Sequence, residues 1–173
     1  MSDFFGRVTE DQDPFKKLVS HIPGFSGYIE RTNRRAADKL LRDTVARRFE
    51  EQYKRLSALQ ADIISQGNIE YMDDLEKAAL LMRTFTDKIR NATYGYAGLF
   101  DAVKINQDEL SKIYTFDAAF FDLADQIKNA LDTVEASMGA LEGLPAAIRN
   151  LVTLARQPVT TYEKRYEIFN GSK

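Results

Sequence analysis

Apolar residues recur at alternating steps of three and four along residues 110–141, and Asp117 is the single polar member of the series. This spacing places the whole series on one side of an α-helix, and a side so apolar has to be covered by other helices. The sequence therefore predicts an all-α fold. The series consists of Leu110, Ile113, Asp117, Phe120, Ala124, Ile127, Leu131, Val134, Met138 and Leu141.

Three further long segments carry the same kind of helical apolar pattern. Gly67 separates the first two by so short a connection that their helices are expected to be antiparallel neighbours. We therefore predict an elongated antiparallel bundle of about four main helices. These helices are expected at about residues 28–66, 69–92, 106–138 and from 145 onward.

A shorter helical element is predicted near each end of the chain. Asp13 followed by Pro14 is typical of a helix start, and Pro23 ends that helix early, so a short N-terminal helix is predicted. Pro158 lies within the last apolar pattern, and its missing N–H predicts a kinked C-terminal helix. We divide the single domain 1–173 into a short helix and turn (1–27), a bundle core (28–157) and a C-terminal helix or tail (158–173).

Composition excludes several classes of protein. The chain has 44% hydrophobic and 29% charged residues, which is typical of a folded domain and not of a disordered segment. No stretch approaches the roughly 20 apolar residues of a membrane span. No basic segment followed by an apolar run opens the chain, so no secretory signal is predicted. The absence of cysteine excludes disulfides and thiolate chemistry and is consistent with a cytoplasmic location.

No catalytic, cofactor or metal site is predicted. The chain has one histidine, His21, outside the long helices, and it has no Glu-x-x-His pair of the kind that di-iron bundles use. A serine nucleophile motif of the Gly-x-Ser-x-Gly type is also absent. We therefore predict that the protein is not an enzyme and binds no cofactor.

Asp117 can be interpreted in two ways, unless its helix rotates locally enough to expose it. As a carboxylate among apolar side chains, it could act as an acid or base with a raised pKa, in a pocket shared with Tyr114 and the aromatic segment 94–100. As a buried polar residue, it would fix the register of its helix and be satisfied by an arginine, a tyrosine hydroxyl or water. The second interpretation is favoured, and Asp117→Leu is then expected to retain or raise thermal stability.

A basic stretch crosses the first long helix. Residues 30–55 contain nine Lys and Arg against five Asp and Glu, a net charge of +4 in a chain whose net charge is −2. This stretch could bind an anionic membrane surface or an acidic partner. Alternatively, it is a solvated face neutralised by pairs four residues apart, such as Asp38 with Arg42. The residues of the predicted anionic-partner surface are Arg31, Arg34, Arg35, Lys39, Arg42, Arg47 and Arg48.

Aromatic residues gather near the C-terminus, at Tyr162, Tyr166 and Phe169. They either pack on the bundle, which is favoured, or form a contact patch for a partner or a second copy.

The favoured function is a non-enzymatic structural or adaptor protein that mediates protein–protein interaction or self-assembly. The alternative is a peripheral membrane protein that lays residues 30–55 on anionic lipid. A ligand carrier or enzyme with a pocket near Asp117 ranks third. Nucleic acid is disfavoured as a partner because the net charge is −2 and no recognised nucleic-acid motif is present.

Overall fold

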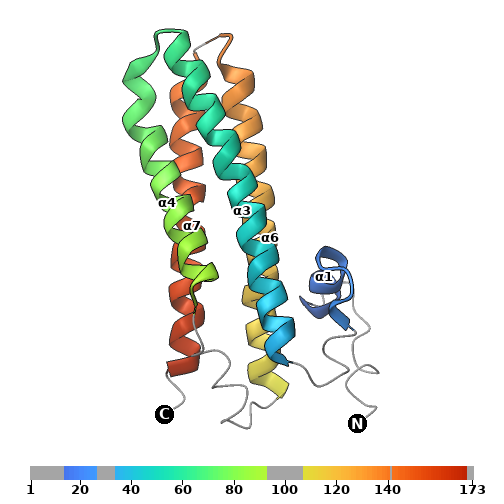
Figure 1. Ribbon diagram of the computed structural model, residues 1–173. Coiled ribbons are helices and arrows are strands. Elements are labelled where there is room, and N and C mark those ends of the chain that lie inside the picture. Colours follow the sequence, from blue (N-terminus) through green and yellow to red (C-terminus); the bar gives the residue numbers. More distant parts are fainter. Residues whose placement is uncertain (1–13, 27–33, 93–106, 141, 171–173) are drawn as a thin grey trace.

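The computed structural model describes residues 14–26, 34–92, 107–140 and 142–170. The predicted all-α bundle is confirmed: four long helices stand side by side and a short one lies beside them (Figure 1). The elements are α1 (Pro14–His21), α3 (Arg34–Ser65), the single 3-10 turn η1 (Ile69–Tyr71), α4 (Met72–Arg90), α6 (Gln107–Ser137) and α7 (Leu144–Asn170).

The four long helices form two antiparallel hairpins, α3 with α4 and α6 with α7 (Figure 1). The hairpins pack so that α3 also contacts α6, and α4 also contacts α7. Because α3 and α6 both run away from the end at which α1 lies, these two neighbours are parallel, as are α4 and α7. The packing between hairpins is therefore parallel, although each hairpin is antiparallel.

The α3–α4 turn shows why the first helix stops where the sequence predicts. Gly67 has a φ of 80°, a left-handed conformation that glycine adopts without a Cβ penalty. The Gly67 N–H donates to the Ile64 carbonyl (2.9 Å), and the Asn68 N–H donates to the Ile63 carbonyl (3.1 Å). These two bonds form a Schellman motif, which satisfies carbonyls that the helix end would otherwise leave open.

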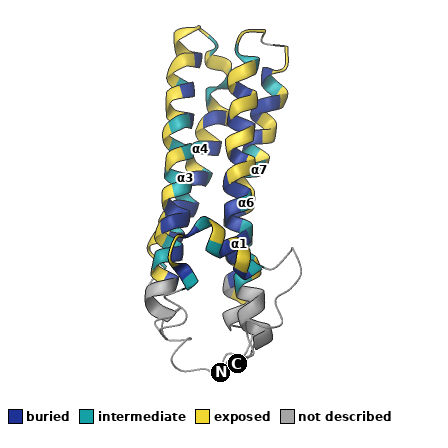
Figure 2. Cartoon of the chain, turned by 90° about the vertical axis from the view of Figure 1, so that its right-hand side faces the viewer, coloured by how far each residue is buried: buried dark blue, intermediate teal, exposed yellow. Residues whose placement is uncertain are grey.

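The core follows the predicted apolar series (Figure 2). Every described member of the α6 series from Asp117 to Val134 is buried, and Met138 is half-buried. At the centre, Phe85 of α4 lies 4.4 Å from Phe49 of α3 and 5.0 Å from Phe120 of α6, measured between ring centroids. Aromatic contacts at these distances join three of the four helices.

The last helix continues through its proline. Pro158 is buried inside α7, which runs on to Asn170, so the predicted C-terminal helix is the second half of α7 and not a separate element. A proline in a helix interior removes one backbone donor. Here its ring lies in the core, where its burial offsets part of that cost.

The predicted N-terminal helix is confirmed as α1, which packs against α6 (Figure 1). Four apolar side chains of this helix and of the turn that follows it are buried. Phe15 and Phe25 both contact Tyr114 of α6, at 5.8 and 6.4 Å between ring centroids. The buried residues of this segment are Phe15, Leu18, Ile22 and Phe25.

Candidate functional site

Three ionisable side chains are buried together between α3, α6 and α7. Arg165 of α7 is 2% exposed, Asp117 of α6 is 3% exposed and Asp38 of α3 is 9% exposed. The Nε atom of Arg165 forms an ion pair with Oδ1 of Asp117 at 2.7 Å, and its Nη2 atom donates a 3.1 Å hydrogen bond to Oδ2. The same Nη2 lies 4.0 Å from Oδ1 of Asp38. Arg165 therefore joins carboxylates from two other helices.

A second arginine completes this group. Arg42 of α3, half-buried at the edge of the core, donates a 2.9 Å hydrogen bond from Nε to Oδ2 of Asp38. We call Asp38, Arg42, Asp117 and Arg165 the buried charge cluster. It contains two positive and two negative groups, so its formal charge is zero. Balance of this kind is what buried charges require, because an uncompensated charge in a core costs several kcal/mol.

Burial shifts the proton affinity of both fully buried members. It raises the pKa of Asp117 well above the usual range, and the nearby negative charge of Asp38 adds to the rise. The guanidinium of Arg165 in contact with Asp117 opposes this effect. Burial lowers the pKa of Arg165 to about 9, although Asp38 partly offsets that change. Both shifts disfavour the charged forms, whereas the ion-pair contact between the two side chains favours them.

The structure gives Asp117 the surroundings that the structural interpretation expected, and the register role itself stays a prediction. Asp117 is buried, and an arginine satisfies it, as the register hypothesis expected. Tyr114, which the alternative placed in a pocket with Asp117, contacts the aromatic rings of α1. The segment 94–100 of that alternative lies outside the described residues.

Arg165 is the site residue that sequence reasoning missed. The core series of α7 starts at Leu144, Ile148, Leu151 and Ala155. It continues through Pro158 and Tyr162 to Arg165 at steps of three, four and three. On that series Arg165 occupies the same kind of core position in α7 that Asp117 occupies in α6. A charged residue on each of two core stripes is a signal that the two residues pair.

The predicted anionic-partner surface is not one free face. Arg42 belongs to the buried charge cluster, and Arg48 pairs with a carboxylate of α6, whereas Lys39 and Arg47 are exposed. Of the expected pairs four residues apart in this region, Asp38–Arg42 is present. Residues whose side chains lie outside the described part of the chain are Arg31, Arg34 and Arg35.

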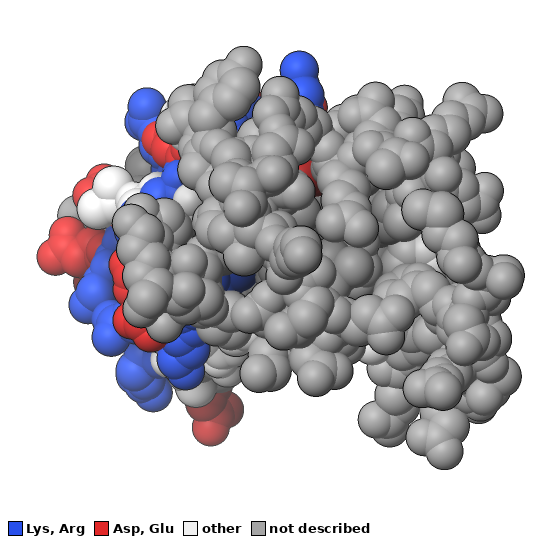
Figure 3. Space-filling model, turned by 90° about the horizontal axis from the view of Figure 1, so that it is seen from below, with Lys and Arg blue, Asp and Glu red and all other residues white. Residues whose placement is uncertain are grey.

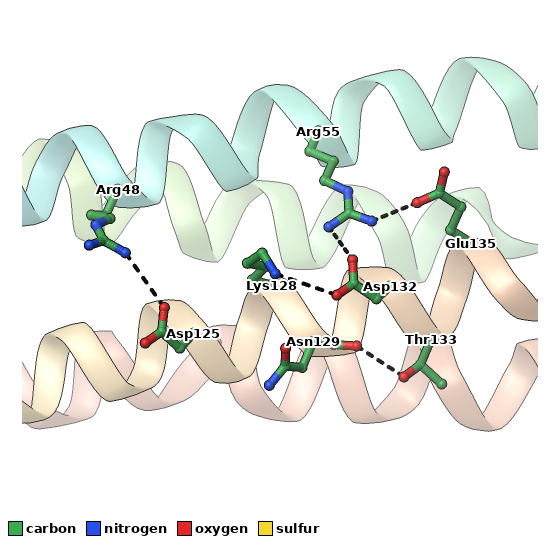
Figure 4. Close-up of polar contacts among 8 residues, drawn as sticks. All are labelled: Arg48, Arg55, Asp125, Lys128, Asn129, Asp132, Thr133 and Glu135. Carbon is green, nitrogen blue, oxygen red and sulfur yellow. Dashed lines mark hydrogen bonds and ion pairs between the residues drawn. The ribbon is translucent and has the colours of Figure 1, made fainter.

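A ladder of ion pairs crosses from α3 to α6 (Figure 4). Arg48 lies 3.6 Å from Asp125, and Arg55 lies 2.5 Å from Asp132 and 2.6 Å from Glu135. Arg55 follows Arg48 by seven residues, and Asp132 follows Asp125 by the same number. One heptad on both helices is the spacing expected of parallel neighbours packed as in a coiled coil. The hydrogen bond from Arg55 also lowers the pKa of Asp132.

The exposed charges that remain on α3 are balanced. Among its described side chains, three cations and three anions are exposed, so the exposed residues carry no net charge. In the view from below, Lys and Arg side chains also lie beside Asp and Glu side chains at the left edge, on the side of the bundle away from α1 (Figure 3). The exposed cations of α3 are Lys39, Arg47 and Lys54, and its exposed anions are Asp43, Glu51 and Asp62.

The predicted aromatic patch is described at one residue. Tyr162 is half-buried and packs against the core, as the favoured interpretation expected. Tyr166 and Phe169 are part of α7, but their side chains lie outside the described atoms.

The largest exposed apolar side chains in the described chain all belong to the α3–α4 hairpin. Ile64 is 50% exposed, Ile69 is 68% exposed and Leu80 is 66% exposed. Ile69 was expected to begin the apolar stripe of the second helix, but it lies in η1, before α4 starts, and points away from the core. We call Ile64, Ile69 and Leu80 the apolar hairpin residues.

The described residues include no group of three or more His, Cys, Asp or Glu side chains placed to hold a metal ion. None of the described helices combines the length and the apolar character needed to cross a bilayer. No protein-family model, curated protein or solved structure matches this chain.

Proposed function

We propose that the protein is a non-enzymatic helical adaptor or scaffold that works through contacts with other protein surfaces or with a second copy of itself. The observation that carries this proposal is the exposure of the apolar hairpin residues. Ile64, Ile69 and Leu80 expose between 50% and 68% of their surface on one hairpin. Exposed large apolar side chains on one hairpin are candidates for contact with another protein surface.

The charges of the bundle support a structural role over a chemical one. Asp117, the strongest candidate for an acid or base, is engaged by Arg165. The cations Arg48 and Arg55 are engaged by carboxylates of α6. A cytoplasmic location, in keeping with a chain that lacks cysteine, is part of this proposal.

The experiment compares the wild type with the triple variant I64S/I69S/L80S. Sedimentation velocity over a wide concentration range measures self-association, and quantitative affinity capture from extract of the native cells measures binding of other proteins. The matched control is Q126S/N129S/N150S, three exposed positions on the other hairpin. We expect association to be lost in the hairpin variant and kept in the control. Association that is equal in all three proteins contradicts the proposal.

Membrane-surface binding is the second candidate. The basic excess of residues 30–55 favours it, but the balanced exposed charge of described α3 weakens it. Flotation with anionic and neutral vesicles at low and physiological salt separates the two functions. Flotation with anionic vesicles alone, lost at higher salt and in an R47E/K54E variant, would place the membrane function first.

A further inference from the structure

Few buried side chains hold α1 on the bundle. α1 has eight residues, too few for a helix to be stable alone in water. Its helical state therefore depends on the contacts that Phe15, Leu18, Ile22 and Phe25 make when they are buried. Any change that weakens these contacts therefore unfolds the segment as well as releasing it from the bundle.

His21, the last residue of α1, also contacts the bundle. Its imidazole stacks on the ring of Phe121 in α6, with centroids 4.6 Å apart and planes 1° from parallel. The guanidinium carbon of Arg48 in α3 lies 6.0 Å from the centre of the same Phe121 ring. A protonated His21 would therefore lie near a second positive charge held by the same aromatic ring.

The carboxylates close to His21 are already occupied. Asp122 pairs with Lys17 of α1, and Asp125 lies 3.6 Å from Arg48. Two carboxylates of α6 thus face two cations, one from α1 and one from α3. A proton on His21 would make three positive charges against two negative ones.

We propose that α1 is a pH-sensitive clasp, which docks on α6 most stably while His21 is neutral and opens more often as His21 takes a proton. Burial, followed by the positive charge of Arg48, lowers the pKa of His21 below 6.5 in the docked state, whereas Asp125 and Asp122 offset part of this shift. In the detached state the pKa returns to about 6.5. Protons therefore bind the detached state more tightly, and docking is fully favourable above pH 6.5 and weakens as the pH falls through the docked-state value.

Release of α1 from α6 would have a functional consequence. When α1 leaves, the aromatic face formed by Tyr114 and Phe121 on α6 is uncovered, because Phe15, Phe25 and His21 contact those two rings. An acidic environment would thus present a second apolar surface, distinct from the apolar hairpin residues. This inference does not rest on the proposed function, because it concerns docking within one chain.

The first measurement is an NMR titration of His21, which gives an unambiguous signal because it is the chain's one histidine. The second is amide hydrogen exchange of residues 14–26 at about pH 7.5 and about pH 5.5, corrected for intrinsic rates, with residues of α4 as the internal reference. We expect a native pKa below 6.5 and a loss of protection confined to 14–26 of at least about threefold at the lower pH.

Two variants make the test specific. His21→Phe retains a ring that can stack on Phe121 but cannot titrate, and its protection over 14–26 should be the same at both pH values. Arg48→Gln removes the nearby cation and releases Asp125, so it should raise the pKa of His21 and reduce the acid-induced loss. A native pKa at or above 6.5, or an equal loss of protection in His21→Phe, overturns the proposal.

Discussion

Arg165 and Asp117 are 48 residues apart in the chain and meet in the core, where Nη2 of the arginine donates a 3.1 Å hydrogen bond to Oδ2 of the aspartate. We expect this pair to fix α7 against α6 at one height, because a shift of either helix by one turn would leave two charges buried without partners. The pair would then specify register where apolar contacts alone would tolerate sliding.

Breaking this pair from one side is expected to destabilise the protein. Asp117→Leu leaves Arg165 buried with Asp38 at 4.0 Å, and Arg165→Met leaves Asp117 beside another carboxylate. Each change should cost roughly 3–5 kcal/mol, with Asp117→Leu near the lower value. Urea denaturation followed by circular dichroism measures the loss.

The double variant Asp117→Leu/Arg165→Met is the control for that prediction. It removes both charges and leaves Asp38 paired with Arg42, so it should recover most of the stability lost in either single variant. The structure here reverses the expectation from sequence, in which Asp117→Leu alone was harmless. A single Asp117→Leu variant as stable as the wild type would show that the pair has no energetic role.

Phe85 is expected to be the most sensitive aromatic residue of the core. It is fully buried and contacts both Phe49 and Phe120, so Phe85→Ala removes contacts to two other helices. We expect a loss of about 3–5 kcal/mol, and less than about 1.5 kcal/mol for Phe85→Leu, which fills more of the space. Thermal and urea unfolding distinguish these values, and equal losses in the two variants would exclude a cavity as the cause.

Gly67 and Gly139 form a matched pair for testing backbone conformation. A Cβ at either position meets no atom within 4 Å, but only Gly67 of the two has a positive φ, 80°. Gly67→Ala should therefore cost about 1 kcal/mol through the left-handed conformation alone, whereas Gly139→Ala should be neutral or slightly stabilising. Chemical denaturation of both variants checks this, and a loss in Gly139→Ala as large as that in Gly67→Ala would refute the explanation.

The ion-pair ladder is expected to depend on salt. Arg55 contacts both Asp132 and Glu135, but all three side chains are partly solvated, so the coupling should be small at low salt. At about 1 M salt the Debye length falls to about 3 Å, and the coupling should vanish. A double-mutant cycle with Arg55→Gln and Glu135→Gln, measured at both salt concentrations, checks this. Coupling that is unchanged by salt would mean that the bond acts through geometry and not through charge.

The fold could be predicted from the sequence because its signals are local. The starts and ends of the helices follow from residues such as Pro14 and Gly67, and the core stripe of α6 follows from its own spacing. The parallel packing of α3 on α6 could not be predicted, because a stripe indicates that a helix is covered but not by which neighbour. One of the two interpretations of the basic stretch has its cations paired along their own helix, whereas Arg48 and Arg55 pair with carboxylates of α6.

The candidate sites, too, could be predicted only in part from the sequence. The burial of Asp117 was predictable because seven-residue spacing defines a core position in one helix. Its partner was expected to be an arginine, a tyrosine or water, and only the packing of α7 identifies Arg165. The exposure of Ile69 was not predicted, because its place in η1 depends on the turn geometry and not on the apolar pattern.

The parallel contact between α3 and α6 has a consequence for the order of folding. Each hairpin joins helices that are consecutive in the chain, whereas Arg55 and Glu135 are 80 residues apart. Contacts between distant residues form late, because closing a long loop costs entropy before any contact compensates for it. The hairpins should therefore form first and dock along the α3–α6 seam last. Weakening that seam should then speed unfolding while leaving the folding rate nearly unchanged.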